Sequence, residues 1–258
     1  MLSLKEIQKY YPENLHFFKN FMLREYLQHK ILEIIFESKY ADRLSFLGGT
    51  CLRIVHNNTR FSEDLDFDNS NLSKSDFDKL AIIIEKQLLR QGYKVEIKNV
   101  FAGAFHCYVR FPNLLFNEQI SGHKEEKILI QLDTEPHNFE YQKEKFIINK
   151  FDVFTSINTT PIDILLAQKF YALINRKRKK GRDFFDIIFL LKNTQANYDY
   201  LNEKLKINNK IALKERLLQE ISKIDLYEMS KDVQAFLFEP DDVKQIILFK
   251  EYITQALS

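Results

Sequence analysis

The chain has 258 residues and a formal net charge of +2, with 45% hydrophobic and 29% charged residues. These proportions are ordinary for a folded protein, so they exclude disorder over most of the chain, and the length suits one large domain or two modest ones. A net charge this close to zero gives no global sign of a nucleic-acid partner, although a local cluster of cations can still provide one.

Membrane, secretory and metal-thiolate classes are also disfavoured. No apolar run reaches the roughly 18–20 residues of a membrane-spanning helix, and residues 1–15 are too charged for a signal peptide, so we expect a cytoplasmic protein without membrane attachment. Two distant cysteines without Cys-x-x-Cys spacing argue against a disulfide framework and a thiolate metal site. Four histidines likewise lack metal-ligand spacing and are treated as incidental: His56, His106, His123 and His137.

The N-terminal part of the chain predicts helices mixed with strands. Apolar residues recur at three- and four-residue steps over 13–36, which predicts a helix. The short apolar stretch 45–47 stops at two glycines, and a helix follows over about 50–55. Strict alternation over 64–68 predicts a half-buried strand.

The next elements are predicted by capping residues and alternation. A helix is expected over 73–93, with Ser75 as its N-cap and Gly92 as its stop. Alternation predicts strands over 94–100, 104–111 and 126–136, so we expect four or five strands in the first 150 or so residues.

The pattern becomes helical throughout from Pro161, which is well placed to begin a helix. We therefore predict an α+β fold with two lobes. Residues 1–155 form a lobe of helices and a mixed sheet, and residues 156–258 form an all-α lobe.

Residues 46–70, FLGGTCLRIVHNNTRFSEDLDFDNS, combine a glycine pair with alternating acids, in a chain that has only 6 Gly. On a strand, Asp64 and Asp66 share one face about 6.5–7 Å apart, where their charges repel unless a cation balances them. Magnesium favours carboxylate oxygens together with substrate phosphates, and a Gly-Gly turn before a helix lets phosphate approach backbone N–H groups. An acidic edge strand with a wet face is the plain alternative.

The stretch FLGGTCLRIVHNNTRFSEDLDFD closely resembles the signature of the AbiEii/AbiGii-type nucleotidyltransferase toxins, which belong to the polymerase-β-like superfamily. The superfamily motif is Gly-Gly or Gly-Ser followed by Asp-hydrophobic-Asp, and the family form adds Arg-Phe-Ser-x-Asp. The resemblance covers about residues 15–190. It implies a polymerase-β-like lobe that transfers a nucleotide from a nucleoside triphosphate, with Mg²⁺ as cofactor, to an acceptor hydroxyl. It also implies the toxin of a type IV toxin–antitoxin or phage-defence pair, hence a cognate antitoxin.

The resemblance implies roles for single residues of the N-terminal lobe. Asp64 and Asp66 would hold the metal ions, with a third carboxylate on a neighbouring strand. Asp133 is the candidate and Glu135 its competitor, although Asp133 can also be a strand-end acid that caps a turn. The residues expected to bind the nucleotide are Gly48, Gly49, Thr50, Arg60 and Ser62.

The C-terminal lobe contributes a lysine and an acid. Lys169 falls on the apolar face of its helix, where a lysine needs a partner or must snorkel, and it can steady the triphosphate. Asp183 and Asp186 lie one helical turn apart, where an acid can also pair with a nearby arginine. The resemblance implies that Lys169 and Asp183 are the functional pair, with Asp186 as the alternative, while Gly181 permits a break at which Asp183 merely caps a helix.

Five consecutive cations follow the Lys169 helix: Arg176, Lys177, Arg178, Lys179 and Lys180. They predict either a solvated loop or a salt-sensitive contact with an RNA backbone. The resemblance favours RNA, since some family members modify the tRNA 3′ end. A small-molecule nucleotidyltransferase of the antibiotic-modifying kind and a non-catalytic partner-binding protein stay open as alternatives.

Overall fold

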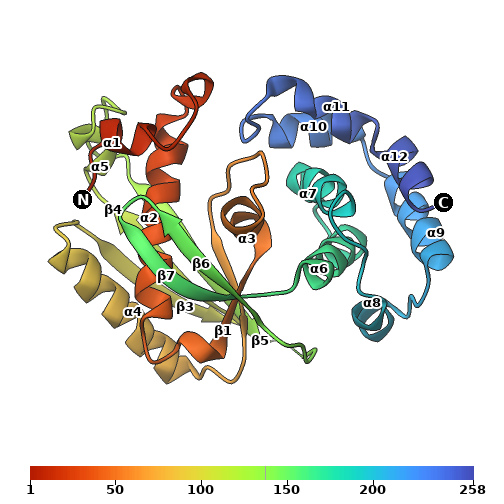
Figure 1. Cartoon of the computed structure of the whole chain (residues 1–258), viewed down its shortest axis with the longest axis horizontal. Helices are drawn as coiled ribbons and strands as arrows, with labels where there is room; N and C mark the ends of the chain where they lie inside the picture. The colour runs from red at the N-terminus through yellow and green to blue at the C-terminus, as the bar shows by residue number, and fades with distance from the viewer. Residues whose placement is uncertain (137) are drawn as a thin grey trace. The chain divides into compact units, whose positions relative to one another are not determined.

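The computed structural model describes residues 1–136 and 138–258, and His137 lies outside them. The chain divides into two compact units, each of which Figure 1 shows as a set of packed elements. The sheet unit comprises Met1–Val55 and Phe61–Thr160, and the helical unit comprises His56–Arg60 and Pro161–Ser258. The helical unit therefore includes five residues that precede the acidic strand in sequence.

A mixed sheet forms the centre of the sheet unit. Within the described residues it has seven strands in the order β3-β4-β5-β2-β1-β7-β6. The pairs β2–β5 and β1–β7 are parallel and the other neighbours are antiparallel, which confirms the predicted α+β class with a mixed sheet. The strands are β1 (Leu44–Leu47), β2 (Leu65–Asn69), β3 (Glu96–Ala102), β4 (Ala104–Phe111), β5 (Ile128–Pro136), β6 (Glu144–Lys150) and β7 (Val153–Thr159).

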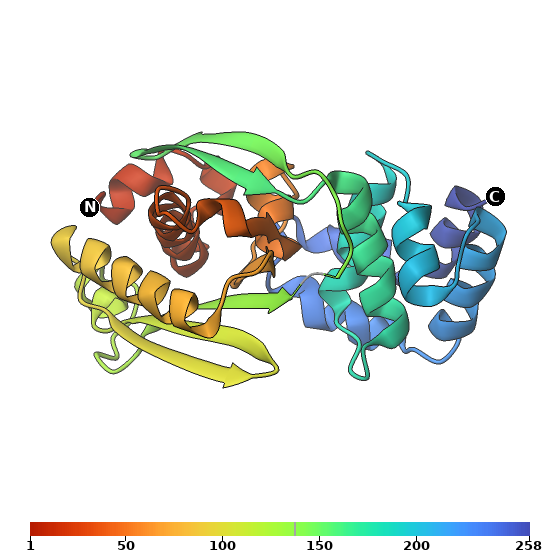
Figure 2. The same ribbon diagram turned by 90° about the horizontal axis from the view of Figure 1, so that it is seen from below.

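Two long helices cover one face of this sheet (Figure 1 and Figure 2). Helix α2 (Lys19–Phe36) contacts β5 and β7, helix α4 (Lys74–Arg90) contacts β3 and β4, and the two helices contact each other. Phe36 of α2 lies 6.2 Å from Phe67 of β2 between ring centroids, so the apolar side of β2 faces α2. The remaining helices of this unit are α1 (Leu4–Gln8), α3 (Gly48–Val55) and α5 (Leu114–Asn117).

Apart from small shifts at the ends of elements, which are one or two residues for helix α3 and strands β2 and β3, the N-terminal elements differ from the prediction in three main places. The helix predicted from residue 13 begins at Lys19, after a separate 3₁₀ turn at Glu13–Leu15. Ser73, and not Ser75, is the N-cap of α4, because its hydroxyl accepts the Asp76 N–H at 3.1 Å. The antiparallel pair β6–β7 was not predicted, since its polar edge strand shows little apolar alternation.

The chain from Pro161 onward is helical, as predicted, with Pro161 at the N-cap of the first helix. Its core is mainly aliphatic with some buried aromatic side chains, among which Phe184 meets Phe249 edge to face at 4.8 Å between centroids. The helices are α6 (Ile162–Asn175), α7 (Gly181–Leu191), α8 (Tyr198–Leu205), α9 (Lys210–Ile221), α10 (Leu226–Gln234), α11 (Val243–Ile247) and α12 (Phe249–Ala256).

Candidate active site

The acids of the β2 segment lie on the face of the sheet opposite the α2 layer. Leu65 and Phe67 are buried at 0% and 3% exposure on the covered face, so the alternating aspartates point the other way. Asp66 stands in register with Asp133 on the parallel neighbour β5. Adjacent strands lie about 4.8 Å apart, so these two carboxylates extend side by side from the sheet. Asp64 precedes the first residue of β2 and continues the alternation.

The position next to the Asp66 carboxylate accepts only glycine, and Gly48 occupies it. Helix α3 begins at Gly48 directly after β1, and the glycine has a φ of +79°. A Cβ at this position would lie 2.1 Å from Asp66 Oδ2. Only glycine therefore combines this left-handed backbone with so close an approach to the acid.

Thr50 stabilises the segment that carries Asp64. Its side chain is fully buried, and its hydroxyl donates a hydrogen bond to the backbone carbonyl of Asp64. Gln28 of α2 donates to the carbonyls of Ser62 and Glu63 at 3.1 and 3.0 Å. The extended segment before β2 is thus fixed from two sides, which sets the position of the acids that follow.

Asp133 is held by two nitrogen donors that the sequence analysis did not single out. His106 Nδ1 lies 2.6 Å from Asp133 Oδ1, and Gln131 Nε2 lies 2.8 and 3.0 Å from the two carboxylate oxygens. Strand β5 continues to Pro136, so Asp133 lies within a strand and not at a turn. Nothing in the sequence pairs His106 with Asp133, because only the β4–β5 register reveals this contact.

Asp68 has a different environment from the other two aspartates. It is 7% exposed, and the Tyr141 hydroxyl donates to its Oδ2 at 2.6 Å. Burial and the neighbouring charge of Asp68 raise the pKa of Tyr141, so the phenol keeps its proton. Thr160 Oγ1 lies 2.8 Å from the same phenol oxygen. Asp68 is therefore part of a buried hydroxyl network, whereas Asp64 and Asp66 are only partly buried.

The carboxylate oxygens at this site suit a hard divalent cation whose remaining ligands come from water and substrate phosphate. Carboxylate oxygens from Asp66 and Asp133 are the ligands that such cations prefer, and the absence of a side chain at Gly48 leaves room for the Asp66 carboxylate. In the described part of the chain, no group of three or more His, Cys, Asp or Glu side chains is arranged to hold a metal ion. Water and phosphate oxygens would have to provide the remaining ligands, as is usual for Mg²⁺.

Lys169 in the helical unit lies between two aspartates. Its Nζ is 2.9 Å from Asp183 Oδ1 and 2.8 Å from Asp186 Oδ2. Burial lowers the pKa of Lys169, but the two neighbouring carboxylates outweigh it, so the pKa is raised and the amine stays charged. Arg176 also pairs with Asp183, at 2.5 Å. Because α7 has Lys180 at its N-cap, Asp183 serves in ion pairs and not as a helix cap.

Arg60 completes this charged cluster. Its Nε and Nη2 lie 2.7 and 2.6 Å from the two oxygens of Asp186, and Asn58 Nδ2 donates to the same carboxylate at 2.8 Å. Burial raises the pKa of Asp186, but Arg60 and Lys169 outweigh it, so the pKa is lowered and the acid stays ionised. Arg60 is 1% exposed, and its guanidinium is engaged by Asp186.

The comparison with known families adds the decisive observation. A family model described as "Nucleotidyl transferase AbiEii toxin, Type IV TA system" matches residues 30–247, which include the glycine pair, the β2 acids and Lys169. The chain belongs to the AbiEii nucleotidyltransferase toxin family. The resemblance seen in residues 46–68 is confirmed. Membership implies a nucleoside triphosphate substrate, a divalent metal ion and an antitoxin partner.

Solved structures support the AbiEii fold. JHP933 from Helicobacter pylori superposes with a TM-score of 0.55 at 19% identity, over 92% of this chain and 93% of that one. A putative nucleotidyltransferase from H. pylori gives 0.56 and 18%, over 92% and 95%. No curated protein matches the chain by sequence. Among the helices of the described residues, none is long and apolar enough to span a membrane.

Two cations of the basic run of this AbiEii protein contact other groups of the helical unit. Arg176 pairs with Asp183, and Lys179 Nζ donates to the last carbonyls of α6, those of Leu173 and Ile174, at 2.6 and 3.0 Å. Four of the five cations are exposed, namely Arg176, Lys177, Arg178 and Lys180, and the Arg176 side chain keeps 40% exposure beside Asp183. Four of the five predicted RNA contacts are therefore presented to solvent, and one of these, Arg176, is also paired with Asp183.

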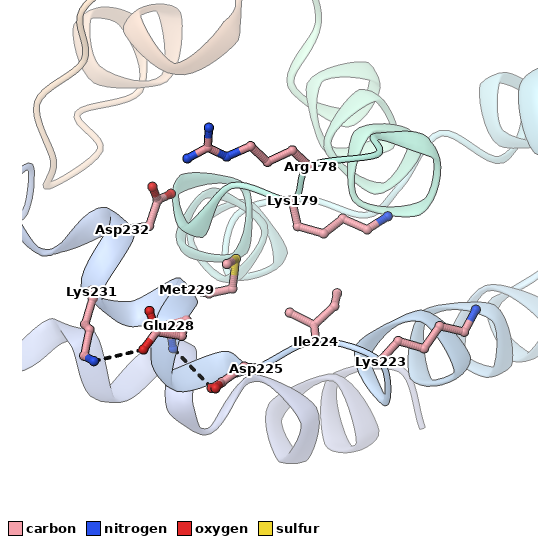
Figure 3. Close-up of a pocket in the computed structure, with 9 residues that line it drawn as sticks. All are labelled: Arg178, Lys179, Lys223, Ile224, Asp225, Glu228, Met229, Lys231 and Asp232. Carbon is pink, nitrogen blue, oxygen red and sulfur yellow. Dashed lines mark hydrogen bonds and ion pairs between the residues drawn. The ribbon is translucent and has the colours of Figure 1, made fainter.

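A cavity of about 570 Å³ lies beside this run within the helical unit. Figure 3 shows Arg178 and Lys179 extending in opposite directions from their loop above α10. The lining carries both signs of charge, so its field is mixed: Arg178, Lys179, Lys223, Ile224, Asp225, Glu228, Met229, Lys231 and Asp232. Asp225 caps α10 and Asp232 accepts the Gly181 N–H, which gives both acids a structural role.

Proposed function

We propose that this protein is a Mg²⁺-dependent toxin that transfers a nucleotide from a nucleoside triphosphate to an acceptor hydroxyl and releases pyrophosphate. The observation that carries the proposal is the register of Asp66 with Asp133, together with the glycine that abuts the Asp66 carboxylate. In the transfer, the acceptor oxygen bonds to the α-phosphorus, the bond to the pyrophosphate oxygen breaks, and the hydroxyl loses its proton.

The roles in the sheet unit follow from the donor chemistry. Asp66 and Asp133 would hold Mg²⁺, with Asp64 as the third proposed ligand, and substrate phosphates would complete the site because no three such side chains of the described residues are already arranged around a metal position. The bound ion would offset the charge of the phosphates and lower the pKa of the attacking hydroxyl. Gly49 and Ser62, at the start of α3 and before β2, are the proposed nucleotide contacts. Gly48 and Thr50 act through the acids, the first by leaving space for one carboxylate and the second by fixing the Asp64 backbone.

The charged cluster of the helical unit supplies the second set of roles. Asp183 retains 7% side-chain exposure and Asp186 has 0%, which favours Asp183 as the functional acid beside Lys169. Asp186 then holds Lys169 in place beside Asp183 through its own buried ion pair with the lysine. Arg60, which we expected to bind the nucleotide, contributes by neutralising Asp186.

An RNA acceptor is favoured by the family resemblance, with the tRNA 3′ end as the specific candidate, and it would place the activity in the cytoplasm. Lys177, Arg178 and Lys180, the exposed cations of the basic run other than the paired Arg176, are the proposed backbone contacts. Replacing two of them, Lys177→Gln with Arg178→Gln, should weaken tRNA binding and reduce the log–log salt slope by about 1.4–1.8, because two phosphate contacts are lost.

The control for that variant removes the same charge elsewhere in the helical unit. Lys244→Gln with Lys250→Gln replaces two lysines outside the basic run, and binding and salt slope should stay at the wild-type values. Fluorescence anisotropy with labelled tRNA at several salt concentrations measures both variants. Equal losses of tRNA affinity in the two double variants would show that net charge alone is responsible. The basic run would then not be part of the tRNA-binding surface.

The test of the activity uses purified protein, Mg²⁺, each of four labelled nucleoside triphosphates and total tRNA, beside Asp66→Asn. We expect label on RNA with the wild type only, and with a preferred base. Retained triphosphate binding without labelled RNA would favour a small-molecule acceptor. Absence of triphosphate binding would overturn the proposed function.

A further inference from the structure

His106, Asp133 and Asp66 form a continuous row across three neighbouring strands. His106 of β4 pairs in register with Asp133 of β5, which pairs in register with Asp66 of β2. Residues in register on adjacent strands direct their side chains to the same face. The imidazole therefore extends from the same face of the sheet as both carboxylates.

The contact between His106 and Asp133 is short and only partly shielded from solvent. Nδ1 and Oδ1 are 2.6 Å apart, and the two side chains are 24% and 27% exposed. Gln131 approaches the same carboxylate from two residues earlier on β5. Donors on two sides leave the carboxylate of Asp133 one favoured orientation.

This orientation matters because Asp66 and Asp133 carry like charges on adjacent strands. Without a fixed donor, the Asp133 carboxylate would be free to rotate, and cation binding would have to restrict that rotation. His106 lies on the side of β5 away from β2, so its hydrogen bond restricts the rotation but does not oppose the repulsion from Asp66. A hydrogen bond donated from Nδ1 to Asp133 pre-organises the acid and also fixes the orientation of the imidazole ring. Donors that orient ligating side chains affect metal affinity or activity by about 10–100-fold when they are removed.

We propose that His106 is a positioning residue that donates from Nδ1 to Asp133 and so presents this carboxylate, beside Asp66, to the divalent cation. The inference rests on the proposed function, since it concerns the same pair of acids. The role belongs to the hydrogen bond and not to the ring, so a different side chain with an N–H donor at the position of Nδ1 should preserve it.

The test measures Mn²⁺ binding to the full-length protein by electron paramagnetic resonance, without nucleotide. His106→Leu removes the donor and should weaken Mn²⁺ binding about 10–100-fold. His106→Asn places an amide N–H near the position of Nδ1 and should restore most of the affinity. His123→Leu, at an exposed histidine of the same unit, should leave binding unchanged, and thermal unfolding confirms that each variant is folded.

The outcomes separate the inference from the proposed function. If His106→Leu binds Mn²⁺ as tightly as wild type while Asp66→Asn and Asp133→Asn lose binding, the role of His106 is overturned and the carboxylate site stands. If binding survives both aspartate variants, the proposed metal site fails, and the His106 inference fails with it. A folded His106→Asn variant that binds no better than His106→Leu, or nitrogen coupling to the bound Mn²⁺, would also overturn a positioning role.

Discussion

Asp64, Asp66 and Asp68 are equally spaced in the sequence, yet their surroundings differ. Asp66 meets a bare glycine and a neighbouring carboxylate, whereas Asp68 is closed in by the Tyr141 hydroxyl. The alternation was sufficient to predict a shared face. It could not separate the third acid from the other two, because Tyr141 lies 73 residues further along the chain.

Gly48→Ala should reduce transfer activity far more than it reduces stability. The left-handed φ costs an alanine about 1–2 kcal/mol, while the new Cβ would displace the Asp66 carboxylate and lower the rate by about 10²-fold. Gly92→Ala is the matched control, since its φ is +89° and no atom lies within 4 Å of the place that an alanine Cβ would take. Thermal unfolding and initial rates distinguish the two, and equal activity in both variants would contradict the role given to Gly48.

Asp186→Asn should destabilise the protein by about 3–5 kcal/mol, because it leaves the buried charges of Arg60 and Lys169 without their shared partner. The lowered pKa of Asp186 means that its contribution is present above the ordinary aspartate pKa and is lost as pH falls below it. Urea unfolding at pH 7 measures the loss. Asp241→Asn, whose pair with Lys244 has side chains 88% and 70% exposed, should change stability by less than about 1 kcal/mol.

Helix α2 carries ionisable groups inside the core of the sheet unit. Glu25 is 3% exposed and pairs with Arg53 at 2.9 Å and with Lys150 at 2.7 Å. Burial raises the pKa of Glu25, but these cations outweigh it and lower the pKa to about 2. Burial lowers the pKa of His29 to about 4, so this histidine is neutral at pH 7. Both shifts make the folded state more stable at neutral pH than in acid.

The His29 shift predicts a loss of stability between about pH 6.5 and pH 4. In that window the unfolded chain binds a proton at His29 that the folded chain does not, so stability falls as pH falls, by on the order of 3 kcal/mol in total. The Glu25 contribution is lost further down, from about pH 4.5 towards 2. In urea unfolding at several pH values, His29→Leu should remove the fall in the free energy of unfolding between about pH 6.5 and pH 4. His123→Leu should keep that fall. The same dependence on pH in both variants and the wild type would contradict the role given to His29.

Elements could be predicted from the sequence where the alternation of buried and exposed positions is visible in their apolar residues. The strands β2 to β5 alternate, and the long helices repeat with apolar periodicity, so both kinds were recognised. Strand β6 has a single buried residue, Ile148, and its polar edge resembles a loop. The N-cap of α4 was misplaced by two residues because Ser73 and Ser75 both satisfy the capping preference, and only the hydrogen bond to Asp76 distinguishes them.

At the scale of the whole molecule, the segment His56–Arg60 was the feature that sequence could not reveal. These residues lie between elements of the sheet unit but belong to the helical unit. The cause is the contact of Asn58 and Arg60 with Asp186, 128 and 126 residues away. The lysine on an apolar helix face did predict that Lys169 needs a partner, although not that it has two.

The family assignment was possible from a local stretch of sequence, whereas the contacts around the site were not predictable from it. The motif around Asp66 was recognisable because the whole stretch of residues 46–68 resembles the family signature, whereas the alternating acids alone would also fit an acidic edge strand. The family match to residues 30–247 extends that assignment over both units. The contacts of His106 and Tyr141 depend on strand register and loop placement, and these follow from packing that no short motif records.

The most direct test of the account compares the initial transfer rates of Asp66→Asn and Asp68→Asn on the acceptor that the labelling experiment identifies. Asp66→Asn should lower the rate by about 10²-fold or more, because it removes a charge from the reacting centre. Asp68→Asn should stay within about threefold of wild type, since an amide oxygen still accepts the Tyr141 hydrogen bond. Equal rates in the two variants, or a larger loss at Asp68, would contradict the assignment of the active site to Asp66 and its neighbour Asp133.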